Sequence, residues 1–405
     1  MKNRLMIYGA YGFTGRLIVE KLKQRLAQAE LDGKAWQAPP LLAGRNARKL
    51  REAAEESGFP CRVVAVTDSE GLDKALLDVA VLLNVAGPFP DTAEPLVKAC
   101  VRNGTHYLDV AGELDVFRGL DNHHLEARAV NVMIMPGVGF SILASDFLVH
   151  RVCARSRYLW GLAPTTIRVA FSKLDFISRG TFRTMLDSVR EGVLVRRNHK
   201  LMSIPVGRLE RSFDFGESGK RDDRICAAAN LADVLTGYYT TGGRIDQPET
   251  RKRRLGPVPN IEAYAEASVL ARALYQVGSV VALPMQLTPF RQLLQLQSSF
   301  WPEEPSEENR ESARQFVVVE GEDLYCRTNR ARLAIGDSYD FTASGAAMMA
   351  ERVLRDVMQD GFDPGHPGHG AKTGFTTPMR AYPGLDKPDM DKLGATILEW
   401  PAPSA

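Results

Sequence analysis

Three glycines near the start of the chain have a spacing that suits phosphate binding. Gly9, Gly12 and Gly15 follow an apolar run that begins at Leu5, and a helical pattern comes after them. Glycine permits a tight turn that brings the backbone close to a pyrophosphate, which then accepts from the N–H groups at the helix start. A purely structural turn is the alternative. The strand, glycine turn and helix predict a dinucleotide site of the variant pattern GxxGxxG, formed by Gly9, Tyr11, Gly12, Phe13, Thr14 and Gly15.

The residue after the second predicted strand indicates which dinucleotide binds. Arg45 follows the strand at residues 40–44, at a position where NAD sites usually carry an acid. An arginine there can pair with the 2′-phosphate of NADP. Alternatively, Arg45 and Arg48 lie on a solvated helix start, although cations are unfavourable there unless an anion binds. We predict NADP(H) as the cofactor, with Arg45, Asn46 and Asp68 among its ligands; Asp68 is also a candidate N-cap of the next helix.

The fourth predicted strand ends in a Gly-Pro turn. Residues 79–89 are almost entirely apolar, which is typical of a central strand in a parallel sheet. A turn at the carboxyl end of such a strand brings backbone close to a ligand bound at that edge of the sheet. We therefore predict that Ala86, Gly87, Pro88 and Phe89 contact the cofactor.

The candidate catalytic residues belong to two parts of the chain. Tyr107 and Glu113 lie at or just after the predicted strand at residues 106–110, near the expected nicotinamide. A tyrosine hydroxyl can supply a proton after hydride transfer, whereas a core tyrosine with a satisfied hydroxyl is the alternative. Glu113 has the alternative of capping a turn. Arg179 opens a predicted helix in the second half, where it can bind a substrate carboxylate or phosphate.

Repeated strand and helix units must position these residues. They predict an α/β fold, with an N-terminal Rossmann-type doubly wound parallel sheet at residues 1–140. Alternating strands at residues 167–171 and 209–215 predict a second α+β domain with a mostly antiparallel sheet. We expect this substrate domain at residues 141–340, and we expect residues 341–400 to pack back on the first domain.

Composition excludes several classes of protein. The net charge of the 405 residues is +2, and acids and bases are interspersed, which argues against a nucleic-acid binder. The five scattered cysteines predict free thiols in a reducing, cytoplasmic compartment, and the first strand leaves no room for a signal peptide. His366 and His369 have no carboxylate or cysteine to complete a site, so we predict no metal.

One apolar stretch leaves the question of membrane contact open. Residues 267–287 are too polar for a typical membrane span, and a buried helix is the favoured interpretation. A helix that lies on a membrane surface is the alternative, so a peripheral membrane contact stays open, as does a homodimer.

Several motifs together resemble the saccharopine dehydrogenase-like oxidoreductases. The first half carries segments 9–15, 43–46, 84–89, 106–109 and 112–113. The second half resembles the trans-acting enoyl reductase-like branch, in segments 178–181, 214–216, 240–242, 259–264, 339–343 and 376–378. This resemblance implies an NADPH-dependent reductase of the C=C bond in a small-molecule or carrier-bound enoyl substrate. The family also includes enzymes that act on C–N bonds of amino-acid-like substrates, and a non-catalytic NADP-binding scaffold is a further alternative.

Overall fold

The computed structural model divides the chain into two compact units. It describes residues 2–32, 36–172, 192–217, 220–243, 256–266, 314–360 and 372–399. The first unit consists of Met1–Leu143 and Tyr339–Pro383, and the second of Ala144–Ser338 and Gly384–Ala405. Each unit is therefore built from two separate stretches of the chain.

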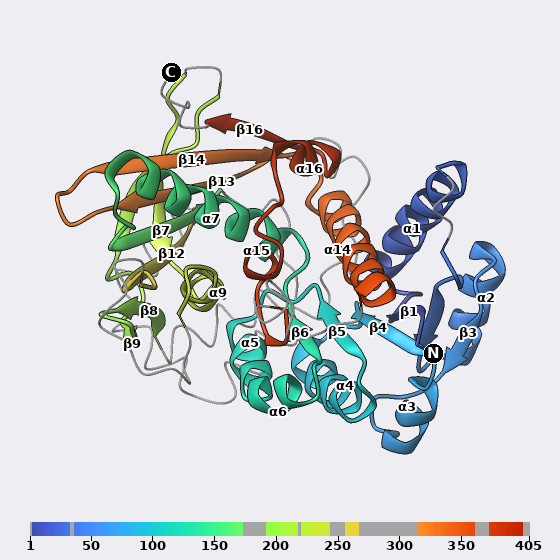
Figure 1. Ribbon diagram of the computed structural model, residues 1–405. Coiled ribbons are helices and arrows are strands. Elements are labelled where there is room, and N and C mark those ends of the chain that lie inside the picture. Colours follow the sequence, from blue (N-terminus) through green and yellow to red (C-terminus); the bar gives the residue numbers. More distant parts are fainter. Residues whose placement is uncertain are drawn as a thin grey trace, which may run out of the picture. The chain divides into compact units, whose positions relative to one another are not determined.

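The first unit contains a parallel sheet (Figure 1). Its strands are β1 (Arg4–Tyr8), β2 (Leu41–Gly44), β3 (Cys61–Val63), β4 (Val79–Asn84), β5 (His106–Asp109), β6 (Met133–Met135) and β15 (Gly374–Phe375). They lie in the order β15-β6-β5-β4-β1-β2-β3, and every pairing is parallel. The strand order reverses between β1 and β4, and ligands of such sheets bind beside that point at the carboxyl ends of the strands.

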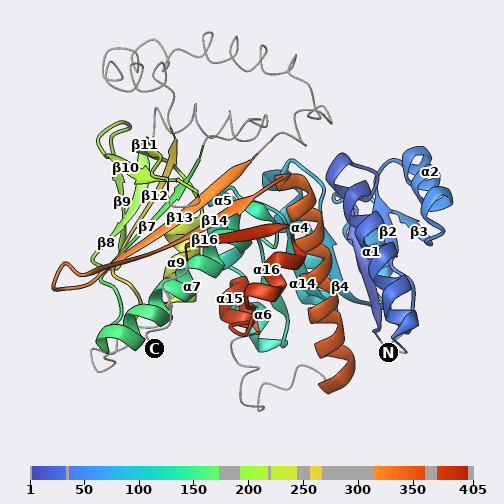
Figure 2. The ribbon, with the colours of Figure 1, turned by 90° about the horizontal axis from the view of Figure 1, so that it is seen from above.

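Helices cover both faces of this sheet. They are α1 (Phe13–Leu31), α2 (Ala47–Ser57), α3 (Ser69–Ala75), α4 (Phe89–Asn103), α5 (Leu114–Asp121), α6 (His124–Ala129), α14 (Ser338–Asp360) and α15 (Pro378–Ala381). Figure 1 shows α1 and α14 on one face, and α3 and α4 on the other. Helices α1 and α14 run side by side (Figure 2). Two polar contacts join them: Lys21 pairs with Asp340 at 2.7 Å, and the Arg25 Nε donates to Glu351 at 2.6 Å.

Strand β15 comes from the distant end of the chain and completes the edge of this sheet. It pairs with β6, and the N–H of Phe375 donates to the Nδ1 atom of buried His124 at 2.8 Å. With only two residues, the strand depends on these contacts rather than on a pattern of its own.

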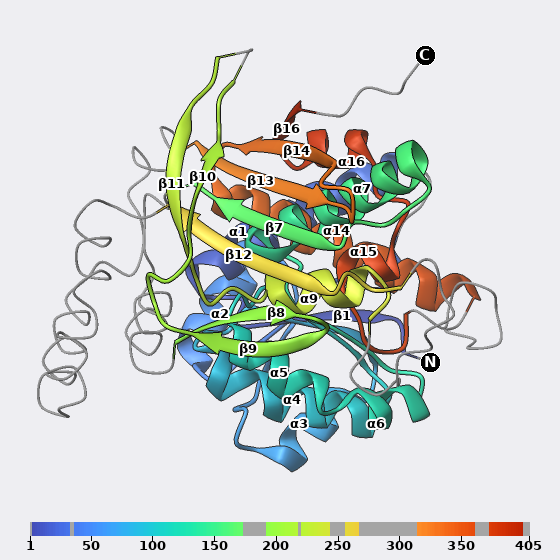
Figure 3. The same cartoon turned by 90° about the vertical axis from the view of Figure 1, so that its left-hand side faces the viewer.

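The second unit contains a larger mixed sheet. Its strands are β7 (Thr166–Phe171), β8 (Val193–Arg197), β9 (Lys200–Ile204), β10 (Glu210–Asp214), β11 (Asp223–Ala228), β12 (Asn260–Glu266), β13 (Gln315–Glu322), β14 (Thr328–Ile335) and β16 (Ala395–Glu399). They follow the order β10-β11-β12-β7-β13-β14-β16, and the β8–β9 hairpin pairs with β12 (Figure 3). Within the described strands, β7 and β12 pair in parallel and the other pairs are antiparallel. This confirms the predicted mostly antiparallel sheet.

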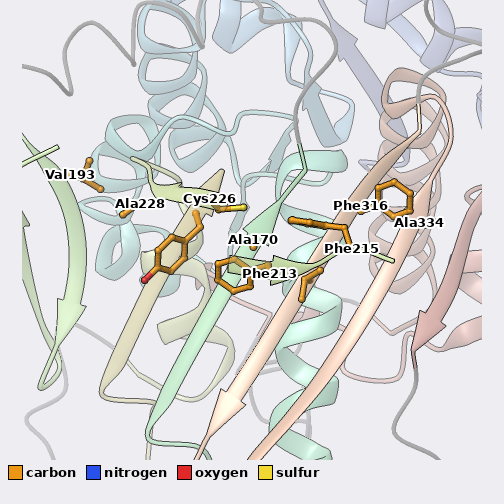
Figure 4. Packing of buried hydrophobic residues seen from close by; sticks show 10 residues of the cluster. Ala170, Val193, Phe213, Phe215, Cys226, Ala228, Phe316 and Ala334 are labelled. Carbon is orange, nitrogen blue, oxygen red and sulfur yellow. The ribbon is translucent and has the colours of Figure 1, made fainter. Parts of the chain in front are cut away.

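An aromatic core covers part of the second sheet (Figure 4). The rings of Phe213 and Tyr264 lie 5.1 Å apart, and Phe215 and Phe316 belong to the same buried cluster. Apolar burial of this kind stabilises the sheet roughly in proportion to the area removed from water. Beside the sheet, the unit contains α7 (Phe140–Trp160, which starts in the first unit), α9 (Asp233–Thr240) and α16 (Lys387–Lys392).

The expectation that all of residues 341–400 packs on the first domain is wrong for the last part of that segment. Strand β16 pairs antiparallel with β14, and Glu399 accepts from Arg330 at 2.9 Å and pairs with Arg332 at 2.8 Å. Backbone pairing and these ion pairs hold residues 384–399 in the second unit instead.

Candidate functional site

The glycine turn after β1 lies where the strand order reverses. Gly9 has φ +93°, a conformation that favours glycine, and its N–H donates to the carbonyl of Ala43 at 2.8 Å. A Cβ atom at Gly9 would lie 2.8 Å from the Cα atom of Ala86, in the turn after β4. The turns that follow β1 and β4 therefore touch each other through a residue that must be glycine.

The other two glycines have different structural roles. A Cβ atom at Gly15 would lie 2.4 Å from the Gly9 carbonyl oxygen, so Gly15 lets α1 pack against its own turn. A Cβ atom at Gly12 would meet only that same oxygen, at 3.3 Å. Gly12 is the N-cap of α1; it makes no side-chain cap, and the first turn of the helix contains no acid. The start of α1 thus offers backbone N–H groups and a positive dipole end to an anion.

The remaining residues predicted in this turn lie around the start of α1. The ring of Tyr11 lies against the backbone of Gly44, where a Cβ atom would be 2.5 Å from the ring. Phe13 packs edge-on against Tyr339, with 5.2 Å between ring centroids. Thr14 lies partly exposed in the first turn of the helix. Their contacts with the cofactor stay predictions.

Arg45 lies at the carboxyl end of β2, beside the same turn. Its side chain is exposed, and it forms no ion pair with an acid in the described part of the chain. Burial raises the pKa of Tyr8 to about 12; Tyr11 adds to this shift and the charge of Arg45 opposes it. The Arg45 charge therefore lies within electrostatic range of Tyr8. By contrast, Arg48 pairs with Glu52 at 2.8 Å, so of these two arginines Arg45 is the one that a phosphate would find without an ion pair.

Two of the predicted cofactor residues serve as helix caps. The Asn46 side chain accepts from the N–H of Lys49 at 3.1 Å, which caps α2. The Asp68 carboxylate accepts from the N–H of Gly71 at 2.9 Å, which caps α3. The N-cap predicted for Asp68 is confirmed, and cofactor contacts of both residues stay predictions.

The turn after β4 is fixed from inside the protein and open on its outer side. The N–H of Ala86 donates to Asn84 at 3.0 Å, and the hydroxyl of Thr92 donates to the Ala86 carbonyl at 2.6 Å. Gly87 and Pro88 are exposed, their peptide bond is cis, and Phe89 starts α4. This turn therefore presents exposed backbone next to Gly9.

Tyr107 lies in the core and its hydroxyl is satisfied. The hydroxyl donates to Asp109 at 2.9 Å and accepts from the Asn84 amide at 3.1 Å. All three residues are fully buried, and burial together with Asp109 raises the pKa of Tyr107 well above its usual value. Burial also raises the pKa of Asp109 to about 7, against the N–H groups of Gly137 and Ala111 that lower it. The geometry supports the alternative of a structural tyrosine.

The other predicted catalytic residues have different outcomes. Glu113 is partly exposed at the N-cap of α5, where its carboxylate accepts from the N–H of Gly112 at 3.0 Å. It follows β5 at the same edge of the sheet as the Ala86 turn. Arg179 lies outside the described residues, as do residues 267–287, His366 and His369.

Asn84 is a polar residue to which the sequence analysis gave no role of its own at the site. It terminates the apolar strand β4 and bonds to Ala86, Thr92 and Tyr107. A single amide at the end of a fully buried strand is the signal that indicates such a role, because a buried polar group must be satisfied.

Three further findings concern the described residues as a whole. No group of three or more His, Cys, Asp or Glu side chains among them could hold a metal ion. Of the helices in the described ranges, none combines the length and the apolar character needed to cross a membrane. Cys61, Cys100, Cys153, Cys226 and Cys326 are free.

The family of the nucleotide-binding region is shown by comparison with known proteins. Residues 5–134 match the family described as "Saccharopine dehydrogenase NADP binding domain". The matched segment runs from β1 to β6 and contains the glycine turn, Arg45 and the Ala86 turn. This confirms the resemblance that the motifs indicated, and it identifies an NAD(P)-binding domain.

Relatives of this chain match it over part of its length. A trans-acting enoyl reductase of Mycobacterium ulcerans (strain Agy99) is 27% identical over 245 residues, which cover 58% of this chain and 56% of that protein. A saccharopine dehydrogenase-like oxidoreductase of Mus musculus is 29% identical over 155 residues, which cover 35% of each chain. The chain therefore spans about half, or less, of the length of these curated relatives. The homology is distant.

A solved structure has a similar fold. Apo histidine-tagged saccharopine dehydrogenase (L-Glu forming) from Saccharomyces cerevisiae is similar with a TM-score of 0.59 and 13% identity, over 98% of both chains. This similarity confirms the predicted fold class.

Proposed function

We propose that this chain is an NADPH-dependent reductase whose cofactor lies across the turns after β1, β2 and β4. The observation that supports this most is the contact of the Gly9 turn with Ala86, beside an α1 N-terminus that has no side-chain cap. A pyrophosphate at this point accepts from the first N–H groups of α1, and the two halves of the dinucleotide extend to either side of the strand-order reversal.

The preference for NADPH rests on Arg45. Its guanidinium follows β2, where the adenosine ribose of a dinucleotide lies, and it forms no ion pair with a described acid. A 2′-phosphate would give this cation a charged partner, which NADH lacks. The description of the matching family as an NADP-binding domain agrees with this preference.

The nicotinamide end lies on the opposite side, beside the Ala86 turn and Glu113. Both follow neighbouring strands, β4 and β5, at one edge of the sheet. When bound, NADPH supplies the hydride. The chain's own contribution is to hold the ring, exclude water and place a proton donor, and Tyr107 is too deeply buried to be that donor.

The proposed reaction is reduction of the C=C bond of an enoyl substrate, either free or bound to a carrier. The distant homology to trans-acting enoyl reductases supports this choice. Reduction or oxidation at a C–N bond is the second candidate, favoured by the similarity to a saccharopine dehydrogenase-like oxidoreductase. In the enoyl reaction, negative charge develops on a carbonyl oxygen that needs a hydrogen-bond donor. Arg179 remains the proposed substrate-binding cation.

The consumption of NADPH with two kinds of substrate tests the proposal. One set of probes is a series of enoyl thioesters of coenzyme A, and the other is an amino acid paired with an oxo acid. Oxidation of NADPH with the thioesters alone supports C=C reduction, and turnover with the second set alone transfers the proposal to C–N chemistry. Tight NADPH binding with no turnover of either set would overturn the reductase and leave a scaffold.

A further inference from the structure

Three buried polar side chains form one connected network beneath the proposed nicotinamide site. Asn84 ends β4, and Tyr107 and Asp109 lie on β5, with Asn84 paired directly opposite Asp109 in the sheet. Tyr107 and Asp109 are two positions apart, so their side chains lie on one face of the strand. The amide of Asn84 donates to the Tyr107 hydroxyl at 3.1 Å, and that hydroxyl donates to Asp109 at 2.9 Å.

Both ends of this network bind backbone of the loops at the carboxyl edge of the sheet. At one end, the Asn84 oxygen accepts from the N–H of Ala86 at 3.0 Å. At the other end, a single Asp109 oxygen accepts from the N–H of Ala111 at 2.9 Å and of Gly137 at 3.0 Å. The turns that follow β4, β5 and β6 are therefore tied together through side chains that do not reach the solvent.

Such a network gives directional restraint that an apolar core does not. Burying three polar groups costs folding free energy unless each one is hydrogen-bonded. Apolar groups of the same shape in their place would leave the stability nearly unchanged or would increase it. Apolar contacts are also non-directional, so they do not fix the direction of a particular N–H group. In this protein the fixed group is the N–H of Ala86, in the turn that meets Gly9.

We propose that Asn84, Tyr107 and Asp109 are positioning residues that hold the Ala86–Gly87–Pro88 turn in the conformation that receives the nicotinamide half of the cofactor. The inference rests on the proposed function, because it takes NADPH as the ligand of that turn. It replaces the role of proton donor predicted for Tyr107 with an indirect one, exerted through Asn84 on the backbone of Ala86.

The test compares two ligands that share the adenosine half of the cofactor. NADPH carries the nicotinamide, and adenosine 2′,5′-bisphosphate does not. Tyr107→Phe removes the link between Asn84 and Asp109 and leaves the ring in the core. We expect the dissociation constant for NADPH to rise roughly tenfold, with a changed nicotinamide fluorescence, and that for the bisphosphate to stay within about twofold.

Tyr382→Phe is the matched control in the same unit. The hydroxyl of Tyr382 also donates to a carboxylate, that of Asp356 at 3.0 Å, but it lies outside the network. We expect this variant to lose thermal stability without a change in affinity for either ligand. Asn84→Ala provides a second variant, because it removes the bond to the Ala86 N–H itself and should weaken NADPH at least as much as Tyr107→Phe.

Each outcome has one meaning. If the unmodified protein does not bind NADPH, the proposed function fails. If it binds NADPH and Tyr107→Phe weakens both ligands equally, or neither, the positioning role is wrong. Unchanged binding and fluorescence together with lost turnover would restore Tyr107 as the proton donor.

Discussion

Among single residues, Arg45 is the side chain whose removal should separate the two nicotinamide cofactors. A charged hydrogen-bonded contact contributes about 1.5–3 kcal/mol, so Arg45→Ala should weaken NADPH binding roughly tenfold to a hundredfold. Binding of NADH should hardly change, because it has no 2′-phosphate. Titration of the variant with both cofactors measures this.

Arg48→Ala is the control for Arg45. This neighbouring arginine is exposed as well, but it pairs with Glu52 at 2.8 Å. Its removal should leave NADPH affinity within about twofold, because its charge already has a partner in Glu52. The loss of this exposed ion pair should also change the free energy of unfolding very little. Equal affinity of the unmodified protein for NADPH and NADH would contradict the assignment of Arg45.

Two glycines of one turn should respond differently to a side chain. Gly12→Val should abolish NADPH binding with little loss of stability, because the side chain enters the space that the pyrophosphate needs. Gly15→Ala should lower the melting temperature of the cofactor-free protein, because its Cβ atom would lie 2.4 Å from a backbone oxygen. NADPH titration beside a thermal melt checks both variants. Normal NADPH binding by Gly12→Val would show that the turn is only structural.

At the scale of single elements, substitutions of the N-cap of α3 can separate an effect on folding stability from an effect on cofactor binding. Asp68 caps this helix through the N–H of Gly71. Asp68→Ala should cost about 1 kcal/mol of the free energy of unfolding, whereas Asp68→Ser keeps a capping oxygen and should cost much less. Denaturant unfolding without cofactor measures the difference. Equal stability of the two variants would mean that the cap contributes nothing.

The same pair of variants also tests whether Asp68 binds the cofactor. The serine variant keeps the helix start but loses the carboxylate. A loss of NADPH affinity in Asp68→Ser therefore reports a contact between this side chain and the cofactor rather than a frayed helix.

The sequence predicted the elements whose signals are local. The apolar run of β4, the glycine turn after β1 and the Asp68 cap each depend on residues close together in the chain. The start of helix α4 at Phe89 has a local reason too, because proline is accepted in a first turn where no N–H partner is needed.

Long-range pairing accounts for what the sequence could not predict. Strand β15 has only Gly374 and Phe375, too short for any periodicity, and it depends on β6 and on His124. Asn84 and Asp109 belong to separate motifs that only the register of β4 against β5 brings together. Neither pairing has a local signal in the sequence.

At the scale of the whole molecule, the pH dependence of stability results from opposing buried groups. Burial raises the pKa of Asp109 in the first unit and of Asp233 in the second to about 7. Burial lowers the pKa of His106 and of His150, again one in each unit, to about 4. In the folded protein these aspartates keep a proton that they lose in the unfolded chain above their usual pKa of 3.8. Their contribution to stability therefore falls as the pH rises towards 7. The histidines contribute stability that is lost as pH falls from 6.5 towards 4.

Asp233→Asn should remove one contribution to the fall in stability that the buried aspartates cause as the pH rises. Between pH 5 and pH 6.5, the free energy of unfolding of this variant should rise with pH more steeply than that of the unmodified protein, by up to about 1.4 kcal/mol per pH unit. Denaturant titrations at several pH values measure the slope. His150→Asn should change the slope in the opposite direction, and identical slopes in all three proteins would refute the pKa shifts.

The division of each unit into two stretches has a consequence for how the chain is made. During synthesis, residues 1–143 leave the ribosome long before α14 and β15 are made. Most of the second sheet likewise leaves it before β16 is made. The two sheets are not complete until residues 374–399 have emerged, so the edges of β6 and β14 are unpaired during the earlier part of synthesis. A stop codon or a ribosome stall before residue 374 would therefore leave both sheets incomplete, rather than one complete domain and one missing domain. Fragments released at that stage should aggregate or need a chaperone.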